Sequence, residues 1–207
     1  MLRPTHQAIS VTSSVGASIA MSVPLSGAVA IVVVARQAAM LPDKMEKIFG
    51  VKMTNHRTWT HWLLTCFLTG AVLGLMVYGL GYLVEYLMRE RLTGSHAHEV
   101  LRTIHTASIG GGVIVWIGST IGTVTHSLAD ACTLSGVPLF GPFTKKKFWL
   151  MPDGLRTRTG DLAKAMKGER MIMTAGEKRW FILAHFMTIF ILFLHFAPYM
   201  HLDKIQS

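Results

Sequence analysis

Charged residues are scarce in this chain of 207 residues, of which they make up only 15%. A soluble domain usually carries about 25% charged residues. Hydrophobic residues account for 51% of the chain, and its mean hydropathy is positive. Water is a poor solvent for such a composition, so we expect a membrane protein instead of a soluble domain.

Cysteine is scarce as well, and acidic residues are few beside basic ones. The two cysteines, Cys66 and Cys132, both fall inside apolar segments. A disulfide framework is therefore not indicated, and we interpret both as small packing residues. The formal net charge is +9. In a membrane protein this excess indicates Lys- and Arg-rich loops that face anionic lipid, so we expect no specific nucleic-acid partner.

Five apolar segments predict an all-α integral membrane protein, a bundle of about five transmembrane helices. A helix needs roughly 20 apolar residues to cross a bilayer. The expected spans are residues 5–21, 23–40, 62–88, 104–131 and 180–196. The first is the weakest, because Ser and other small residues dilute it. Glycines in the third and fourth spans predict close helix contacts, namely Gly70, Gly74, Gly79, Gly81, Gly110, Gly111, Gly112 and Gly118.

The basic residues predict a division into three parts and an orientation. We expect a four-span membrane domain at 1–143, a basic loop at 144–179, and a fifth span with a short tail at 180–207. The loop at 144–179 holds ten of the twenty Lys and Arg residues. Positively charged loops stay in the cytoplasm, which predicts a cytoplasmic N-terminus. The loop also predicts contact with anionic lipid headgroups, with an ordinary positive-inside anchor as the alternative, and a short amphipathic helix over 161–173.

This topology gathers side chains that bind metals and anions at the cytoplasmic ends of the first four spans. Imidazole nitrogens and carboxylate oxygens are common ligands of divalent metals. Ionisable groups at membrane depth are costly and tend to face the bundle interior. The candidates are His6, Asp43, His56, Arg57, His61, His126 and Asp130. Taken singly, each is better explained as an interfacial or hydrogen-bonded residue, and only their coincidence on one side indicates a shared site.

The spacing of the candidates supports a shared site. His126 and Asp130 are four residues apart, so they share one helix face. The pair could ligate one metal, or Asp130 could orient the imidazole. We expect His56 in the loop and His61 in the first turn of the third span. Asp43 follows Leu41-Pro42, where the proline makes a turn favourable.

Four sequence blocks resemble a known family. Residues 56–61, His-Arg-Thr-Trp-Thr-His, resemble the His-Arg-x-x-Thr-His signature of the membrane-bound metal-dependent hydrolases typified by the YdjM inner-membrane protein, also described as LexA-binding. Residues 125–143 resemble the His-x-x-x-Asp and Gly-Val-x-Leu stretches of that family. Thr5-His6 and Leu41-Pro42-Asp43 match its N-terminal elements. The resemblance covers residues 5–150.

The resemblance implies a function and a set of site residues. It implies a multi-pass protein of the bacterial inner membrane that acts as a metal-dependent hydrolase at the cytoplasmic interface, on an amphiphilic or anionic substrate such as a phosphoester or lipid. It implies a divalent metal, with zinc the expected ion, held by His6, Asp43, His56, His61, His126 and Asp130. It further implies that Asp43, Arg57 and Asp130 are catalytic, with the arginine as an anion holder and an aspartate as general base.

One departure from the family and one alternative function accompany this interpretation. The family often has a second acidic residue two positions after Asp43, where this chain has Met45. Its loss removes a possible ligand, which indicates either one metal where relatives hold two or a site that has decayed. The alternative is a non-catalytic membrane protein with a structural metal and a basic loop that binds a partner or lipid. A small transporter is disfavoured, because the spans show no paired inverted repeat.

The remaining histidines are expected to be structural. His96, His98 and His105 fall on or near the outer segment, where we expect solvated polar residues. His185 and His195 lie ten residues apart in the last span. Packing or a cross-helix hydrogen bond explains this pair best, with a proton path as the alternative.

Overall fold

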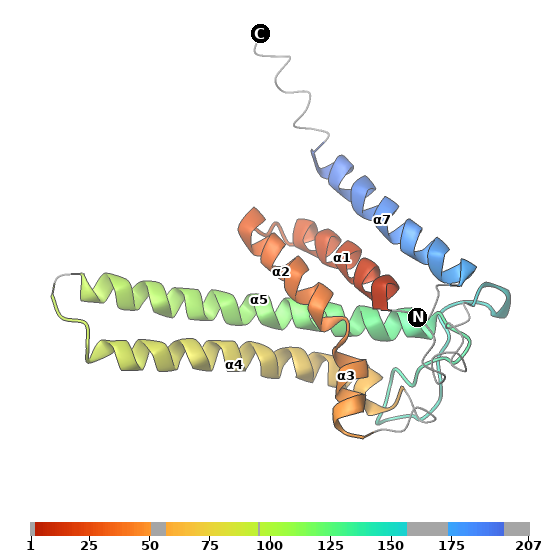
Figure 1. Ribbon diagram of the computed structural model, residues 1–207, viewed down its shortest axis with the longest axis horizontal. Helices are drawn as coiled ribbons and strands as arrows, with labels where there is room; N and C mark the ends of the chain where they lie inside the picture. The colour runs from red at the N-terminus through yellow and green to blue at the C-terminus, as the bar shows by residue number, and fades with distance from the viewer. Residues whose placement is uncertain (1–2, 51–56, 95, 157–173, 197–207) are drawn as a thin grey trace, which may run out of the picture.

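The computed structural model describes residues 3–50, 57–94, 96–156 and 174–196. Within these ranges the regular structure is helical, apart from one isolated bridge between Val137 and Phe148 (Figure 1). The prediction of an all-α bundle is therefore confirmed. The helices are α1 (Arg3–Ala20), α2 (Leu25–Ala38), α3 (Leu41–Ile48), α4 (Leu63–Arg89), α5 (Ala97–Ala131) and α7 (Ala175–Phe196), with short 3-10 turns η2 (Trp59–His61) and η3 (Asp153–Leu155).

Four stretches are long and apolar enough to cross a membrane, which makes the chain a multi-pass membrane protein. They are Leu25–Ile48, which covers α2 and α3, then Leu63–Arg89, Ala97–Ala131 and Ala175–Phe196. Large apolar side chains are exposed along α4 and α7, as lipid-facing surfaces require. The predicted first span, α1, forms a helix but is not one of the four, because Ser and Thr lower its hydropathy.

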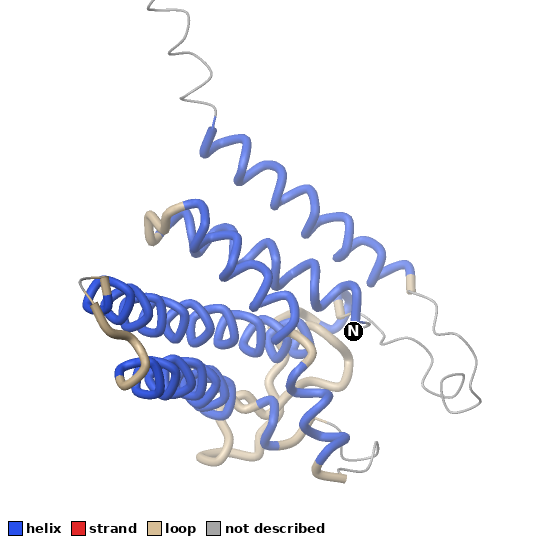
Figure 2. The backbone as a smooth tube through the Cα atoms, turned by 60° about the vertical axis from the view of Figure 1, so that its left-hand side comes forward, coloured by secondary structure: helices blue, strands red, loops and turns tan. Residues whose placement is uncertain are grey.

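α1 lies inside the bundle and connects its parts. It packs against α2, α5 and α7, and Figure 2 shows α7 on the far side of α1 from α4. The Ser10 hydroxyl donates to the Ala35 carbonyl of α2 at 2.9 Å. The Thr12 hydroxyl contacts the Ala184 carbonyl of α7 at 2.7 Å and the Thr188 hydroxyl at 2.8 Å. The Ser and Thr side chains that lower the hydropathy of α1 therefore bind it to α2 and α7 through hydrogen bonds.

α4 and α5 form a long antiparallel pair (Figure 1) that depends on glycine. A Cβ at Gly74 would lie 2.7 Å from the Gly112 carbonyl oxygen and 2.8 Å from the Trp116 Cβ. Small residues allow helix backbones to approach in this way in lipid. The predicted close contacts are confirmed here, but not at Gly79 or Gly110, where a Cβ would meet nothing within 4 Å.

A break between α2 and α3 brings an acidic segment to the end of the bundle. α2 packs closely on α5, since a Cβ at Gly122 would lie 2.8 Å from the Ala38 Cβ. α2 then ends at Ala38, and α3 begins at Leu41 with Pro42 in its first turn. Proline lacks a backbone N–H and is tolerated at this position. The expected turn lies at Ala39 and Met40, just before Leu41-Pro42, which itself opens the new helix. This turn places α3 beside η2 and α5 (Figure 1).

The segment after α5 covers the same end of the bundle. The backbone N–H of Leu63, the first residue of α4, donates to the Leu139 carbonyl at 2.9 Å. Val137 and Leu139 are buried, with Phe148 packed against them. α7 begins at Ala175, five residues before the expected start of the last span. The amphipathic helix predicted over 161–173 lies outside the described residues.

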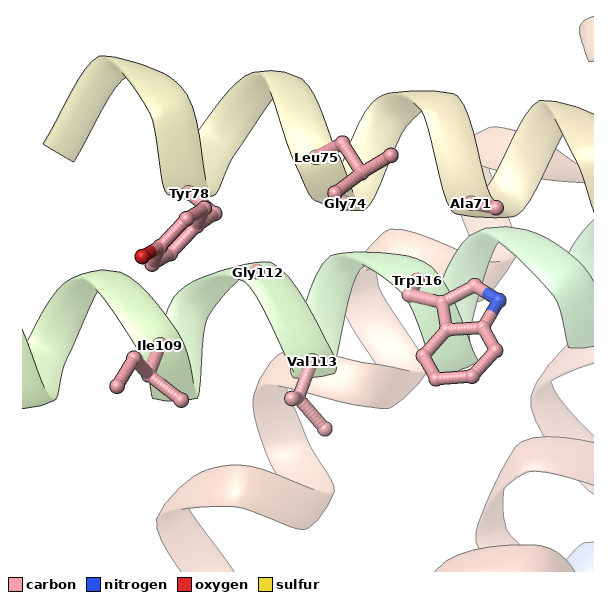
Figure 3. A pocket seen from close by; sticks show the side chains of 8 residues that line it. All are labelled: Ala71, Gly74, Leu75, Tyr78, Ile109, Gly112, Val113 and Trp116. Carbon is pink, nitrogen blue, oxygen red and sulfur yellow. The ribbon is translucent and has the colours of Figure 1, made fainter. Parts of the chain in front are cut away.

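A groove between two of the long helices is apolar and lies away from the polar end of the bundle. It has a volume of about 430 Å³ and runs between α4 and α5, with Tyr78 and Trp116 among its lining residues (Figure 3). No His, Cys, Asp, Glu, Lys or Arg lines it. Such a surface between two spans suits lipid hydrocarbon and offers no group for acid–base or metal chemistry.

The close contact of α4 and α5 predicts a difference between two glycines of one helix. Gly74→Ala should lower the free energy of unfolding by about 1–3 kcal/mol, because its Cβ would overlap α5 backbone. Gly79→Ala is the matched control and should be neutral or stabilising by up to about 1 kcal/mol, because Ala is the better helix former. Unfolding in mixed detergent micelles measures both, and equal effects would contradict the packing described.

Candidate functional site

Buried polar side chains gather at the end of the bundle where α1, α3, η2 and α5 meet. The structure brings six of the seven candidates together: His6, Asp43, Arg57, His61, His126 and Asp130. The seventh, His56, lies outside the described residues. The predicted face shared by His126 and Asp130 is confirmed, since His126 Nε2 lies 3.9 Å from Asp130 Oδ2.

Three groups from different elements face one another at the centre. His61 Nε2 and His126 Nε2 are 3.2 Å apart. Asp43 Oδ1 lies 3.8 Å from His61 Nε2 and 3.3 Å from His126 Nε2. A triangle with these sides has its corners about 2.0 Å from its centre, which is the usual length of a Zn–N or Zn–O bond. The donor types and their separations therefore fit a divalent metal ion.

Asp130 lies beside this triangle and is buried, with a side chain 1% exposed. Its Oδ1 is 3.3 Å from His6 Nε2, and its Oδ2 is 2.7 Å from Arg57 Nε. Oδ2 is also 3.7 Å from His61 Nε2. A buried carboxylate is tolerated only when it is paired and hydrogen-bonded. Asp130 is thus both an ion-pair partner and a possible fourth ligand.

His6 extends the cluster to α1. Its ring stacks on that of His126, with centroids 3.9 Å apart and planes 21° from parallel. His6, His126 and Asp130 form a second group whose ligand atoms all lie within 4.8 Å of one another. The Nδ1 atoms of His6 and His126 are buried and have no hydrogen-bond partner in the described part of the chain. Such atoms are costly, and a cluster that contains them could hold a metal ion.

His61 lies just outside α4, in a different position from the expected one. It ends the η2 turn, whereas α4 begins at Leu63, because the backbone of Trp62 between them is extended. Burial lowers the pKa of the His61 imidazole below its ordinary value. Loss of water disfavours the charged ring, so the neutral form is favoured. That is the form in which histidine binds metals.

Arg57 faces the cluster from a strained backbone. Its φ of 71° lies in the left-handed region that non-glycine residues rarely adopt. The guanidinium contacts Asp130 through Nε and donates from a terminal nitrogen to the Thr133 hydroxyl at 2.6 Å. The Thr133 hydroxyl in turn donates to the Asp130 carbonyl at 2.7 Å. Arg57 therefore braces Asp130, and its role as an anion holder stays a prediction.

The sequence did not predict three residues of the site, namely Glu46, Thr60 and Thr133. Glu46 is 3% exposed. Its Oε1 accepts from the backbone N–H of Arg57 at 2.9 Å and from the Thr60 hydroxyl at 2.8 Å. Glu46 is three residues after Asp43 in α3 and Thr133 three after Asp130. This spacing of three residues from a predicted candidate was the signal that could have identified Glu46 and Thr133.

The other histidines lie away from the cluster. His96 and His98 are exposed, as expected. His105 forms a cross-helix contact that the sequence did not predict, with Nδ1 2.9 Å from Glu85 Oε2 of α4. Packing or a cross-helix hydrogen bond was expected for His185. Its ring packs on Phe181, with centroids 4.3 Å apart, and its Nδ1 contacts the Phe181 carbonyl of the same helix at 2.8 Å.

The fold and the site together define a class: a multi-pass helical membrane protein with a buried His and Asp cluster that could hold a metal ion. A family model described as the YdjM inner membrane protein matches residues 1–202, and the chain belongs to this family. The resemblance drawn from the four sequence blocks is thereby confirmed. Searches of curated proteins and of solved structures found no match.

The burial of Asp130 predicts a large cost for loss of its arginine. Arg57→Ala should lower the free energy of unfolding by about 3–5 kcal/mol, because the carboxylate stays buried without its closest cation. Arg102 is the matched control, since it is exposed on α5, the helix that carries Asp130. Arg102→Ala should cost no more than about 0.5 kcal/mol. Denaturation in micelles measures both values, and comparable losses would contradict the role of Arg57.

Proposed function

We propose that this protein is a membrane-embedded metal-dependent hydrolase whose site lies at the cytoplasmic end of the bundle. The observation that carries the proposal is the convergence of Asp43 Oδ1, His61 Nε2 and His126 Nε2 within 3.8 Å of one another. Two imidazoles and a carboxylate are a ligand set found in catalytic zinc sites. Zinc is therefore the ion we assign, with Asp43, His61 and His126 as its ligands.

The surrounding residues divide the work between binding and proton transfer. When bound, a divalent ion supplies a water of lowered pKa and polarises the ester under attack. Asp43 is the ligand group nearest to solvent, since its side chain is 27% exposed whereas His61 and His126 are fully buried. We assign Asp43 as the group that receives a proton from the attacking water. Asp130, held by Arg57 and His6, supplies fixed negative charge beside the imidazoles.

The loop after α5 supports an amphiphilic or anionic substrate. Lys145 and Lys147 are exposed, and Phe143 beside them is 85% exposed. The Leu139–Leu63 hydrogen bond ties this loop to the start of α4, two residues after His61. Aromatic rings with nearby ammonium groups suit the boundary between lipid tails and anionic headgroups. A phosphoester or lipid ester at the cytoplasmic membrane surface fits this setting.

A second candidate is a non-catalytic protein with a structural metal. The observation that favours it is Asp130 Oδ2, which lies 3.7 Å and 3.9 Å from the two central Nε2 atoms and could act as a fourth ligand. A site closed by four protein ligands is structural, whereas a catalytic site leaves one position for water. The two functions therefore differ in whether Asp130 binds the ion.

Metal content tests the site. Detergent-purified protein should carry about one zinc ion per chain, and both His61→Ala and His126→Ala should lose it while the spans still insert. His185→Ala is the matched control, because this exposed histidine lies on α7 away from the cluster. Elemental analysis measures all four proteins. Zinc retained in both cluster variants would remove this site.

Turnover separates the enzyme from the structural alternative. The zinc-loaded protein should hydrolyse at least one of p-nitrophenyl phosphate, bis-p-nitrophenyl phosphate and a long-chain p-nitrophenyl ester. Asp43→Asn should lower this rate about 100-fold or more, because it removes both a zinc ligand and the proton acceptor. Activity that survives in both Asp43→Asn and His126→Ala would come from another protein. Bound zinc without turnover would favour the structural site.

A further inference from the structure

We propose that Glu46 and Thr60 are positioning residues that hold His61 in the tautomer whose Nε2 lone pair faces the cluster. The inference rests on the proposed function for its importance, but the tautomer itself is a property of the protein alone. Neither Glu46 nor Thr60 is one of the three assigned ligands, and neither lies at the centre of the cluster. Both act through His61.

Hydrogen-bond roles around Thr60 determine the position of the proton on His61. The Thr60 hydroxyl lies 2.8 Å from Glu46 Oε1 and 2.9 Å from His61 Nδ1. An ionised carboxylate only accepts hydrogen bonds, so the single hydroxyl proton of Thr60 is donated to Glu46. The Thr60 oxygen is then an acceptor towards His61. Nδ1 must therefore carry the imidazole proton.

The opposite nitrogen of the same ring is the one in the cluster. His61 Nε2 lies 3.2 Å from His126 Nε2 and 3.8 Å from Asp43 Oδ1. With the proton on Nδ1, Nε2 presents its lone pair there. A metal-binding histidine usually donates its other N–H to an acidic or carbonyl group, which orients the ring and raises its basicity. Here the acceptor of the His61 Nδ1–H is the Thr60 hydroxyl, which in turn donates to Glu46.

Glu46 also fixes the backbone that carries His61. Besides Thr60, its Oε1 accepts from the backbone N–H groups of Arg57 at 2.9 Å and Thr58 at 3.0 Å. These bonds hold the strained conformation of Arg57. Because Asp43 and Glu46 both belong to α3, one short helix supplies a central carboxylate and the acid that orients an imidazole from another element.

Glu46 is better placed for orientation than for binding an ion itself. Its Oε1 lies 3.4 Å from His61 Nδ1, on the side of the ring that faces away from the cluster. The ligand atoms of Asp43 and His126 meet His61 on the Nε2 side. A carboxylate oxygen that already accepts several hydrogen bonds has little capacity left for a cation.

Nitrogen-15 NMR of histidine-labelled protein in micelles tests the tautomer directly, without any metal. His61→Ala identifies the His61 signals, and the neutral ring should carry its proton on Nδ1. Thr60→Val removes the hydroxyl and should mix or invert the tautomers, whereas Thr60→Ser should restore the wild-type pattern. Thr58→Val is the matched control, since its hydroxyl also lies near Glu46 Oε1, at 3.4 Å, and it should leave the His61 signals unchanged.

Metal affinity gives the second readout. Zn²⁺ affinity from chelator competition should fall about 10- to 100-fold in Thr60→Val and Glu46→Gln. The ligand-field bands of the Co²⁺-loaded protein should shift in the same variants. Thr60→Ser and Glu177→Gln should stay within about threefold of wild type; Glu177 is a buried glutamate that contacts the Thr174 backbone N–H at the start of α7.

The outcomes separate the two proposals. A wild-type His61 protonated on Nε2, or a Thr60→Val protein with the wild-type tautomer, would overturn the inference whether or not metal binds. Unchanged zinc affinity in Thr60→Val and Glu46→Gln would also overturn it, while the hydrolase proposal stands. A wild-type protein that binds neither Zn²⁺ nor Co²⁺ would end the hydrolase proposal, and the NMR result would still decide the tautomer.

Discussion

A buried negative charge at the end of a membrane bundle imposes the main constraint on this structure. The Asp130 carboxylate is 1% exposed, and removing such a group from water costs several kcal/mol. Arg57 on one oxygen and His6 on the other offset that cost. Because these partners come from the loop before α4 and from α1, the charge can be buried only if both segments meet on α5.

The same meeting point requires unusually close helices. Side-chain nitrogen and oxygen atoms from different elements lie less than 4 Å apart in the cluster. The backbones that carry them must therefore approach closely. Gly122 lets α2 lie against α5, and the Ser10 hydroxyl bonds α1 to α2 at 2.9 Å. In lipid, small residues and short polar side chains provide most of this attraction, since no hydrophobic force drives helices together. The weak hydropathy of α1 is therefore a consequence of its packing role.

One edge of the site is partly exposed to solvent, and its interior is buried. Asp43 is the partly exposed member, whereas His6, His61 and His126 are buried. Water or a substrate would thus approach from the side of α3. The loop beyond α5, with exposed lysines and Phe143, lies at this same end of the chain's spans. Buried imidazoles, a partly exposed carboxylate and an amphiphilic surface are brought together at one end of the bundle.

The sequence alone determined the features that depend on chain neighbours. Long apolar runs predicted α4, α5 and α7, the four-residue spacing predicted the shared face of His126 and Asp130, and Leu41-Pro42 predicted the turn before Asp43. Four motif blocks identified the family. Each of these follows from local periodicity or from residue order, which the chain carries without folding.

Only the tertiary structure decided which distant groups touch. The bonds from Glu46 to Thr60 and to the backbone of Arg57, the bracing of Asp130 by Arg57, and the pairing of His105 with Glu85 all join residues on different elements. No spacing along the chain encodes these contacts. They arise because helices packed through glycine and serine bring groups that are far apart in the sequence, such as Arg57 and Asp130, within hydrogen-bond distance.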